Sequence, residues 1–126
     1  MSQTDSRQLA VALLDAVNER AWDRIETRTT VDVELRLPPG RVFAGREGVR
    51  DFLEALQGLI PDLTVVGTRI YAGDDFAVIE YESAGHGAVS AEGMGVLVLR
   101  VEGDRLSRVQ LYVDTALWKD LARGSL

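Results

Sequence analysis

A chain of 126 residues with 46% hydrophobic content can fill one hydrophobic core, so a single domain over residues 1–126 is expected. Its net charge of −6 and its scattered basic side chains argue against binding to nucleic acid, and the absence of cysteine excludes disulfides and thiolate chemistry. No apolar run reaches the roughly 20 residues that span a bilayer, and the polar N-terminus lacks signal-peptide features. We therefore expect a cytoplasmic protein without membrane contacts.

The sequence offers few residues for metal or cofactor chemistry. His86 is the sole histidine, so one chain cannot assemble the usual two- or three-histidine catalytic site. Lys119 is the sole lysine, and its polar surroundings do not favour Schiff-base chemistry. We expect neither a metal nor a cofactor.

Helical periodicity begins the chain and returns once in its middle. From a polar cap at Asp5 or Ser6, apolar residues recur at intervals of three and four, and Trp22 with Ile25 predicts a second short helix. The same spacing after Gly45 predicts a further helix. The apolar positions of the first and last of these helices are Leu9, Leu13, Ala16, Val17, Val49, Phe52, Leu53, Leu56 and Ile60.

Strand patterns occupy most of the rest. Residues 31–37 alternate strictly between apolar and polar side chains, which predicts a strand with one face on the core and the other in water. Further strands, rich in β-branched and aromatic residues, are predicted over 64–71, 76–84, 94–102 and 105–114. A last amphipathic segment covers 115–121. This order indicates an α+β fold with helices packed on one face of a sheet.

The last hairpin predicts which side chains share a face. If Gly103 and Asp104 form a two-residue turn, Tyr112 lies opposite Gly95 and Gln110 opposite Leu97. Asp114 joins them on that polar face. The other face becomes an apolar patch, which predicts a homodimer that covers it. The patch consists of Val96, Val98, Val109, Leu111 and Val113.

Three short motifs occur in the order of a known family: 45–53 (GREGVRDFL), 61–63 (PDL) and 112–114 (YVD). By these motifs the chain resembles the SnoaL-like branch of the nuclear transport factor 2-like (NTF2-like) superfamily. The resemblance implies a cone in which N-terminal helices pack inside a strongly curved mixed or antiparallel sheet. It also implies an internal pocket and dimers formed through the outer sheet face. Polyketide cyclases, ketosteroid isomerase, limonene epoxide hydrolase and non-catalytic binding domains share this fold.

The resemblance also implies candidate catalytic residues. Asp114 matches the acid/base aspartate of SnoaL-like cyclases, although an aspartate here could instead cap the C-terminal helix. His86 lies where the family often has a polar pocket residue, but a histidine between two glycines could equally be exposed. Tyr112 and Gln110 could orient a carbonyl or enolate oxygen, or fill the cone and its rim.

An apolar ligand cavity is expected beside these polar groups. Its predicted lining is Leu35, Leu37, Leu97, Leu99 and Tyr112, with Trp22 and Phe52 either in the core or on the pocket wall.

The mechanisms of two related enzymes can be tested by asking whether this chain has their catalytic residues at the matching positions. At the positions where ketosteroid isomerase has its polar catalytic residues, this chain has Leu13, Leu37 and Leu97. These apolar side chains disfavour the isomerase mechanism. The positions that match the limonene epoxide hydrolase residues are Tyr81, Ser83 and Asp114, of which only the last fits.

Three functions follow as hypotheses. The first is a cofactor-independent cyclase or isomerase that acts on a polyketide-like or polycyclic substrate by acid/base catalysis. The alternative is a non-catalytic ligand-binding or dimerisation module, and an epoxide hydrolase-like enzyme is a further alternative.

Overall fold

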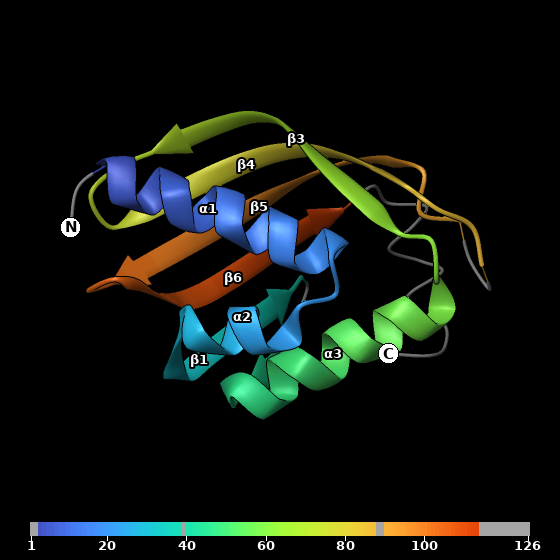
Figure 1. The fold of residues 1–126 in the computed structure, drawn as a ribbon, viewed down its shortest axis with the longest axis horizontal. Coiled ribbons are helices and arrows are strands. Elements are labelled where there is room, and N and C mark those ends of the chain that lie inside the picture. The colour runs from blue at the N-terminus through green and yellow to red at the C-terminus, as the bar shows by residue number, and fades with distance from the viewer. Residues whose placement is uncertain (1–2, 39, 88–89, 114–126) are drawn as a thin grey trace.

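The structure is a computed structural model and describes residues 3–38, 40–87 and 90–113. Two helices begin the chain, and a third helix separates the first two strands from the last four (Figure 1). Their bounds are α1 Gln3–Asn18, α2 Trp22–Thr27, β1 Thr29–Leu37, β2 Arg41–Ala44, α3 Gly45–Leu59, β3 Thr64–Ala72, β4 Phe76–Ala84, β5 Gly93–Glu102 and β6 Arg105–Val113.

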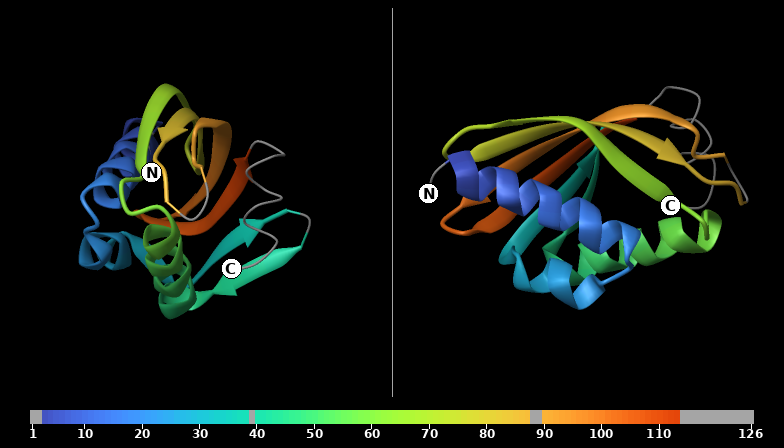
Figure 2. Two further views of the ribbon diagram at one scale, coloured as in Figure 1. Left: turned by 90° about the vertical axis from the view of Figure 1, so that its right-hand side faces the viewer. Right: turned by 45° about the horizontal axis from the view of Figure 1, so that its top comes forward.

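The strands form one six-stranded sheet in the order β2-β1-β6-β5-β4-β3. Strands β1 and β6 pair in parallel, and every other neighbouring pair is antiparallel. The sheet is strongly curved, and α1, α2 and α3 lie on its concave side (Figure 2). The predicted α+β cone with a mixed sheet is therefore confirmed. Among the described residues, no helix is long and apolar enough to cross a bilayer.

Most predicted elements match the observed ones within two residues, but β2 was missed. This strand has only four residues, none of them buried, at the edge of the sheet, so it carries no apolar alternation that a sequence could reveal. The predicted segment 115–121 lies outside the described residues.

Side-chain contacts fix the helices against the sheet. The Asn18 side chain, at the end of α1, pairs with the backbone of Val65 in β3. Its Nδ2 donates to the Val65 carbonyl at 2.7 Å, and its Oδ1 accepts from the Val65 amide at 2.8 Å. At the other side of the cone, Arg46 of α3 donates to the carbonyl of Thr29 at the start of β1. Both contacts satisfy backbone groups of the sheet and connect α1 and α3 to it.

A β-bulge in β6 corrects the predicted register of the last hairpin. The turn itself is as expected, with Glu102 opposite Arg105. Leu106 then pairs with Val101, but the next pair is Arg108 with Arg100, so Ser107 is an extra residue without a partner. Because side chains alternate, one inserted residue moves every later side chain of β6 to the opposite face.

The bulge exchanges the two predicted faces of β6. Tyr112 lies opposite Val96 and Gln110 opposite Val98, on the convex face. Val109, Leu111 and Val113 lie on the concave face, so they do not belong to the predicted outer patch. Only Val96 and Val98 of that patch keep their predicted side.

Strand β4 has the faces that its alternation predicts. Ile79 and Tyr81 are buried on the concave side, whereas Glu80 and Glu82 are exposed on the convex side. Several large apolar side chains are also exposed on the convex side. They are Val42, Val66, Tyr71, Phe76, Met94 and Tyr112.

Candidate apolar ligand pocket

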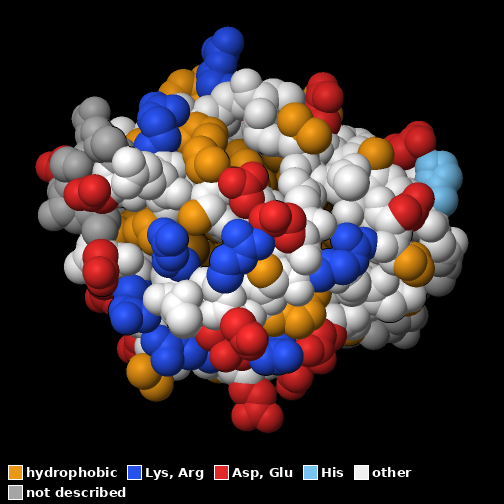
Figure 3. All heavy atoms as spheres, in the orientation of Figure 1, with side chains coloured by type: hydrophobic (Ala, Val, Ile, Leu, Met, Phe, Trp, Pro, Cys, Tyr) orange, Lys and Arg blue, Asp and Glu red, His pale blue; other side chains and the backbone are white. Residues whose placement is uncertain are grey.

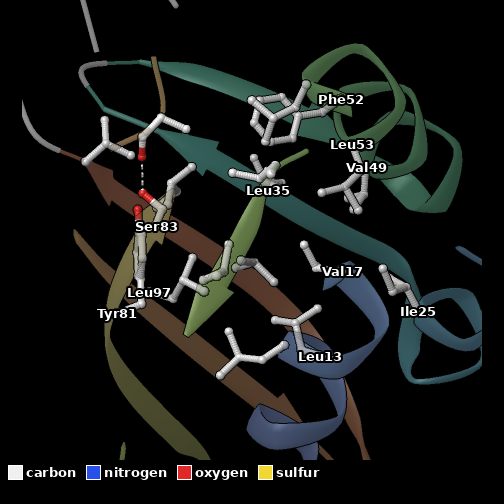
Figure 4. A pocket seen from close by; sticks show the side chains of 18 of the residues that line it. Leu13, Val17, Ile25, Leu35, Val49, Phe52, Leu53, Tyr81, Ser83 and Leu97 are labelled. Atoms are coloured by element: carbon white, nitrogen blue, oxygen red, sulfur yellow. Dashed lines mark hydrogen bonds between the residues drawn. The ribbon is translucent and has the colours of Figure 1, made fainter. Parts of the chain in front are cut away.

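A pocket of about 110 Å³ lies between the concave face of the sheet and the helices. A cavity needs only about 10–15 Å³ to hold one water, so this space is sufficient for a small organic molecule. Figure 4 shows the lining side chains pointing into it from both helices and sheet. The lining consists of Leu13, Leu14, Val17, Ile25, Thr29, Val33, Leu35, Val49, Phe52, Leu53, Leu56, Ile60, Leu63, Val65, Tyr81, Ser83, Ala91, Leu97, Val109, Leu111 and Val113.

The periodicity of each element accounts for this lining. The apolar stripes of α1 and α3 face the sheet, and alternate residues of the strands face the helices. On β6 these alternate residues are Val109, Leu111 and Val113, which reach the pocket because of the bulge.

Three lining residues carry polar side chains. Thr29 has little remaining capacity for a ligand, because its Oγ1 donates to the Glu26 carbonyl at 3.1 Å and accepts from Arg46 Nε at 3.3 Å. Tyr81 donates to the Tyr112 carbonyl at 3.5 Å, a long hydrogen bond. Ser83 donates to the Ala91 carbonyl. The described wall contains no carboxylate, imidazole, ammonium or guanidinium group.

Burial raises the pKa of Tyr81 to about 12. The phenol is surrounded by apolar side chains, and its ionised form would be poorly solvated there. Tyr81 therefore keeps its proton at neutral pH and serves as a neutral hydrogen-bond donor.

The structure places His86 away from the pocket. Its ring is mostly exposed, with Nδ1 2.9 Å from the Gly85 carbonyl and Nε2 3.4 Å from a Glu92 carboxylate oxygen. The backbone amide of His86 donates to Asp62 at 2.8 Å, which holds the loop at the surface. Figure 3 shows the chain's one histidine at the edge of the molecule beside acidic side chains. The predicted catalytic histidine is therefore not a pocket residue.

Tyr112 and Gln110 do not reach the pocket either. The Gln110 amide donates to the Tyr112 hydroxyl at 2.7 Å on the convex face, and 43% of Tyr112 is exposed. The prediction failed because it counted back from the turn without the extra residue at Ser107. Asp114 lies outside the described residues, directly after Val113 in the chain.

The predicted apolar lining is partly correct in position. Leu35, Leu97 and Phe52 line the pocket. Leu37 and Leu99 are almost fully buried in the surrounding core and do not line it. Trp22 borders a separate small hollow with α3 instead of the main pocket.

Sequence reasoning did not assign Tyr81 and Ser83 to the ligand site. The alternation in β4 already placed Tyr81 on the inner face, and Ser83 shares that face two residues later. Their signal was therefore present, but it was weak because a strand serine carries no periodic apolar pattern.

Comparisons with known proteins fit this architecture. The SnoaL-like domain model matches residues 10–109. A candidate ketosteroid isomerase from Kribbella flavida DSM 17836 has 26% identity and a TM-score of 0.78, with 89% of this chain and 79% of that chain covered. A search of curated proteins gives no significant match.

Two further solved structures share the fold at lower identity. A candidate SnoaL-like polyketide cyclase from Jannaschia sp. CCS1 has 14% identity and a TM-score of 0.84, covering 97% of this chain and 94% of that chain. An epoxide hydrolase of the LEH-like type from M. tuberculosis has 20% identity and a TM-score of 0.79, covering 97% of this chain and 92% of that chain.

The chain belongs to the SnoaL-like domain family of the NTF2-like superfamily. Proteins described as cyclases, isomerases and epoxide hydrolases share its fold. Membership therefore defines the architecture and the place of the pocket, while the chemistry depends on the side chains of this particular wall.

The raised pKa of Tyr81 predicts a loss of stability in alkaline solution. Between pH 10 and pH 12 the phenol ionises in the unfolded chain, where its pKa is about 10, but not in the folded one. The unfolded state then binds fewer protons, so stability falls by up to about 1.4 kcal/mol per pH unit. Urea unfolding at several alkaline pH values measures this slope. Tyr81→Phe should flatten it, and an unchanged slope in that variant would contradict the prediction.

Proposed function

We propose that the protein binds a small, neutral, largely apolar molecule in the pocket between α1, α3 and the sheet. The observation that carries this proposal is the wall itself, which is apolar apart from Thr29, Tyr81 and Ser83. Apolar pockets with a few convergent polar groups are typical ligand sites. An anionic or cationic ligand would lose its hydration without gaining an opposite charge from the described wall.

Filling the pocket should abolish this binding. Leu56 of α3 is partly buried and lines the pocket, so Leu56→Trp places an indole in the ligand's space. Leu59 of the same helix is also partly buried but does not line the pocket, and Leu59→Trp is the matched control. Calorimetric titration with 2-methylnaphthalene should give binding for the wild type and Leu59→Trp but not for Leu56→Trp. Equal binding by both variants would contradict the proposed site.

We also propose a second function, acid/base catalysis by Asp114, because this residue matches the acid/base aspartate of cyclases in the SnoaL-like family to which the chain belongs. A carboxylate near an apolar wall has a raised pKa, which suits the removal of a proton beside a carbonyl group. The described wall has no carboxylate or imidazole, so an isomerase or cyclase reaction of this type would depend on Asp114.

Deuterium exchange separates catalysis from binding. With 1-tetralone in D₂O, a catalytic carboxylate removes a C2 proton to form an enolate, and a deuteron returns to the same carbon. NMR should show faster loss of the C2 proton signal with wild-type protein than in buffer. Asp114→Asn should slow this exchange by roughly 10²-fold to 10⁴-fold, whereas Asp104→Asn, in the exposed turn of the last hairpin, should not. Wild-type exchange at the buffer rate would favour binding alone.

We propose, finally, that two copies associate through the convex sheet face. Exposed Phe76, Met94 and Tyr112 and partly buried Val96 and Val98 lie there, with Glu80 and Gln110 opposite the two valines, and apolar side chains exposed in this way favour association. Val98→Glu should convert a dimer to a monomer in sedimentation velocity experiments, because the charge would be desolvated in the interface. Val11→Glu, at an exposed position of α1 on the other side of the sheet, adds the same charge away from these residues and should remain dimeric. A monomeric wild type would contradict this proposal.

A further inference from the structure

Two side chains of β4 that line the pocket, Tyr81 and Ser83, carry hydroxyl groups. Tyr81 and Ser83 are two residues apart, so they lie on the same strand face, roughly 7 Å apart along the backbone. Figure 4 shows both side chains extending from β4 at one side of the apolar lining. Since Thr29 is already paired twice through its hydroxyl, Tyr81 and Ser83 carry the remaining side-chain hydroxyls of the described wall.

Ser83 offers the ligand an acceptor. A serine hydroxyl has one proton and two lone pairs, and Ser83 donates its proton to the Ala91 carbonyl. The Ala91 amide in turn donates to the Gly85 carbonyl at 2.9 Å, so the loop that supplies this acceptor is tied back to the end of β4. The proton of Ser83 is therefore occupied, and its lone pairs are what remains.

Tyr81 offers the ligand a donor. Its hydrogen bond to the Tyr112 carbonyl is 3.5 Å long, which is weak enough to yield to a better acceptor. Gly95 makes room for this hydroxyl, because a Cβ at position 95 would collide with it and with the Tyr112 carbonyl. Burial keeps the phenol protonated through neutral pH.

We infer that Tyr81 and Ser83 recognise a hydroxyl group on an otherwise apolar ligand, with Tyr81 donating to the ligand oxygen and Ser83 accepting its proton. An alcohol or phenol provides both functions in one group. A ketone or ether provides only an acceptor and leaves Ser83 without a donor. A hydrocarbon pairs with neither group. This inference rests on the proposed binding of an apolar ligand and adds the substrate class, an alcohol or phenol on a small ring system.

The test combines two ligands of similar shape with single hydroxyl deletions. 2-Naphthol carries a hydroxyl where 2-methylnaphthalene carries a methyl group, and titration calorimetry measures both dissociation constants for each variant. Tyr81→Phe should raise the dissociation constant of 2-naphthol roughly 5-fold to 10-fold, which is the effect of one lost hydrogen bond. The same variant should bind 2-methylnaphthalene as well as the wild type does, or better. Ser83→Ala should change the ratio of the two constants in the same direction.

Matched deletions outside the pocket serve as controls. Tyr71→Phe removes an exposed phenol from the convex face, and Thr27→Ala removes an exposed hydroxyl that also donates to a backbone carbonyl, that of Arg24. Neither should alter the ratio. The inference is overturned if Tyr81→Phe and Ser83→Ala leave the ratio unchanged, or weaken both ligands equally, in variants with wild-type circular dichroism. If 2-methylnaphthalene binds without such discrimination, the apolar pocket stands and only its hydroxyl recognition fails; if neither ligand binds the wild type, both proposals fail.

Discussion

Which side chains line the pocket depends on one residue of the last strand that has no partner on the neighbouring strand. Ser107 interrupts the pairing of β5 and β6, and this bulge turns Val109, Leu111 and Val113 toward the helices. Without it, the polar side chains of β6 would face α1 and α3, and the apolar ones would face solvent. A single inserted residue has this effect because side chains alternate along a strand with a period of two. The apolar character of the cavity therefore results from a backbone irregularity as much as from composition.

The apolar wall limits the chemistry that the described residues can perform. Tyr81 and Ser83 can form hydrogen bonds, but neither serves as a general base at neutral pH, because burial keeps the Tyr81 phenol protonated and the Ser83 hydroxyl is neutral and hydrogen-bonded to the Ala91 carbonyl. His86 is at the surface. Within the described residues the site is thus suited to binding and orientation, and acid/base catalysis would need Asp114.

Much of the fold could be predicted from the sequence. Residues 31–37 and β4 alternate regularly, so their inner faces were predictable, and the helical stripes that contain Leu13 and Phe52 placed those residues in the interior. These patterns arise because burial of apolar surface selects the same side of an element at every turn or pleat. The two-residue turn at Gly103 and Asp104, between β5 and β6, was also predicted correctly.

The candidate site was less predictable. A bulge of the Ser107 kind leaves little trace in a sequence, because the residues on both sides of it are still typical of a strand. One missed residue reversed the assignment of Gln110 and Tyr112, although Leu35 and Leu97 were placed correctly. The position of His86 depends on backbone contacts of its loop, such as the hydrogen bond from its amide to Asp62, which periodicity does not encode.

The central claim is the inward orientation of alternate β6 residues after the bulge, and single-cysteine labelling tests it directly. The chain has no cysteine of its own, so Leu111→Cys and Tyr112→Cys each provide one reactive thiol. The rate of maleimide labelling is measured on folded protein, diluted until it sediments as a monomer, and again in urea. The structure predicts that Tyr112→Cys reacts faster than Leu111→Cys in the folded protein, and that the two rates become similar in urea. The opposite order of protection would show that β6 has no bulge and that its polar side chains line the pocket.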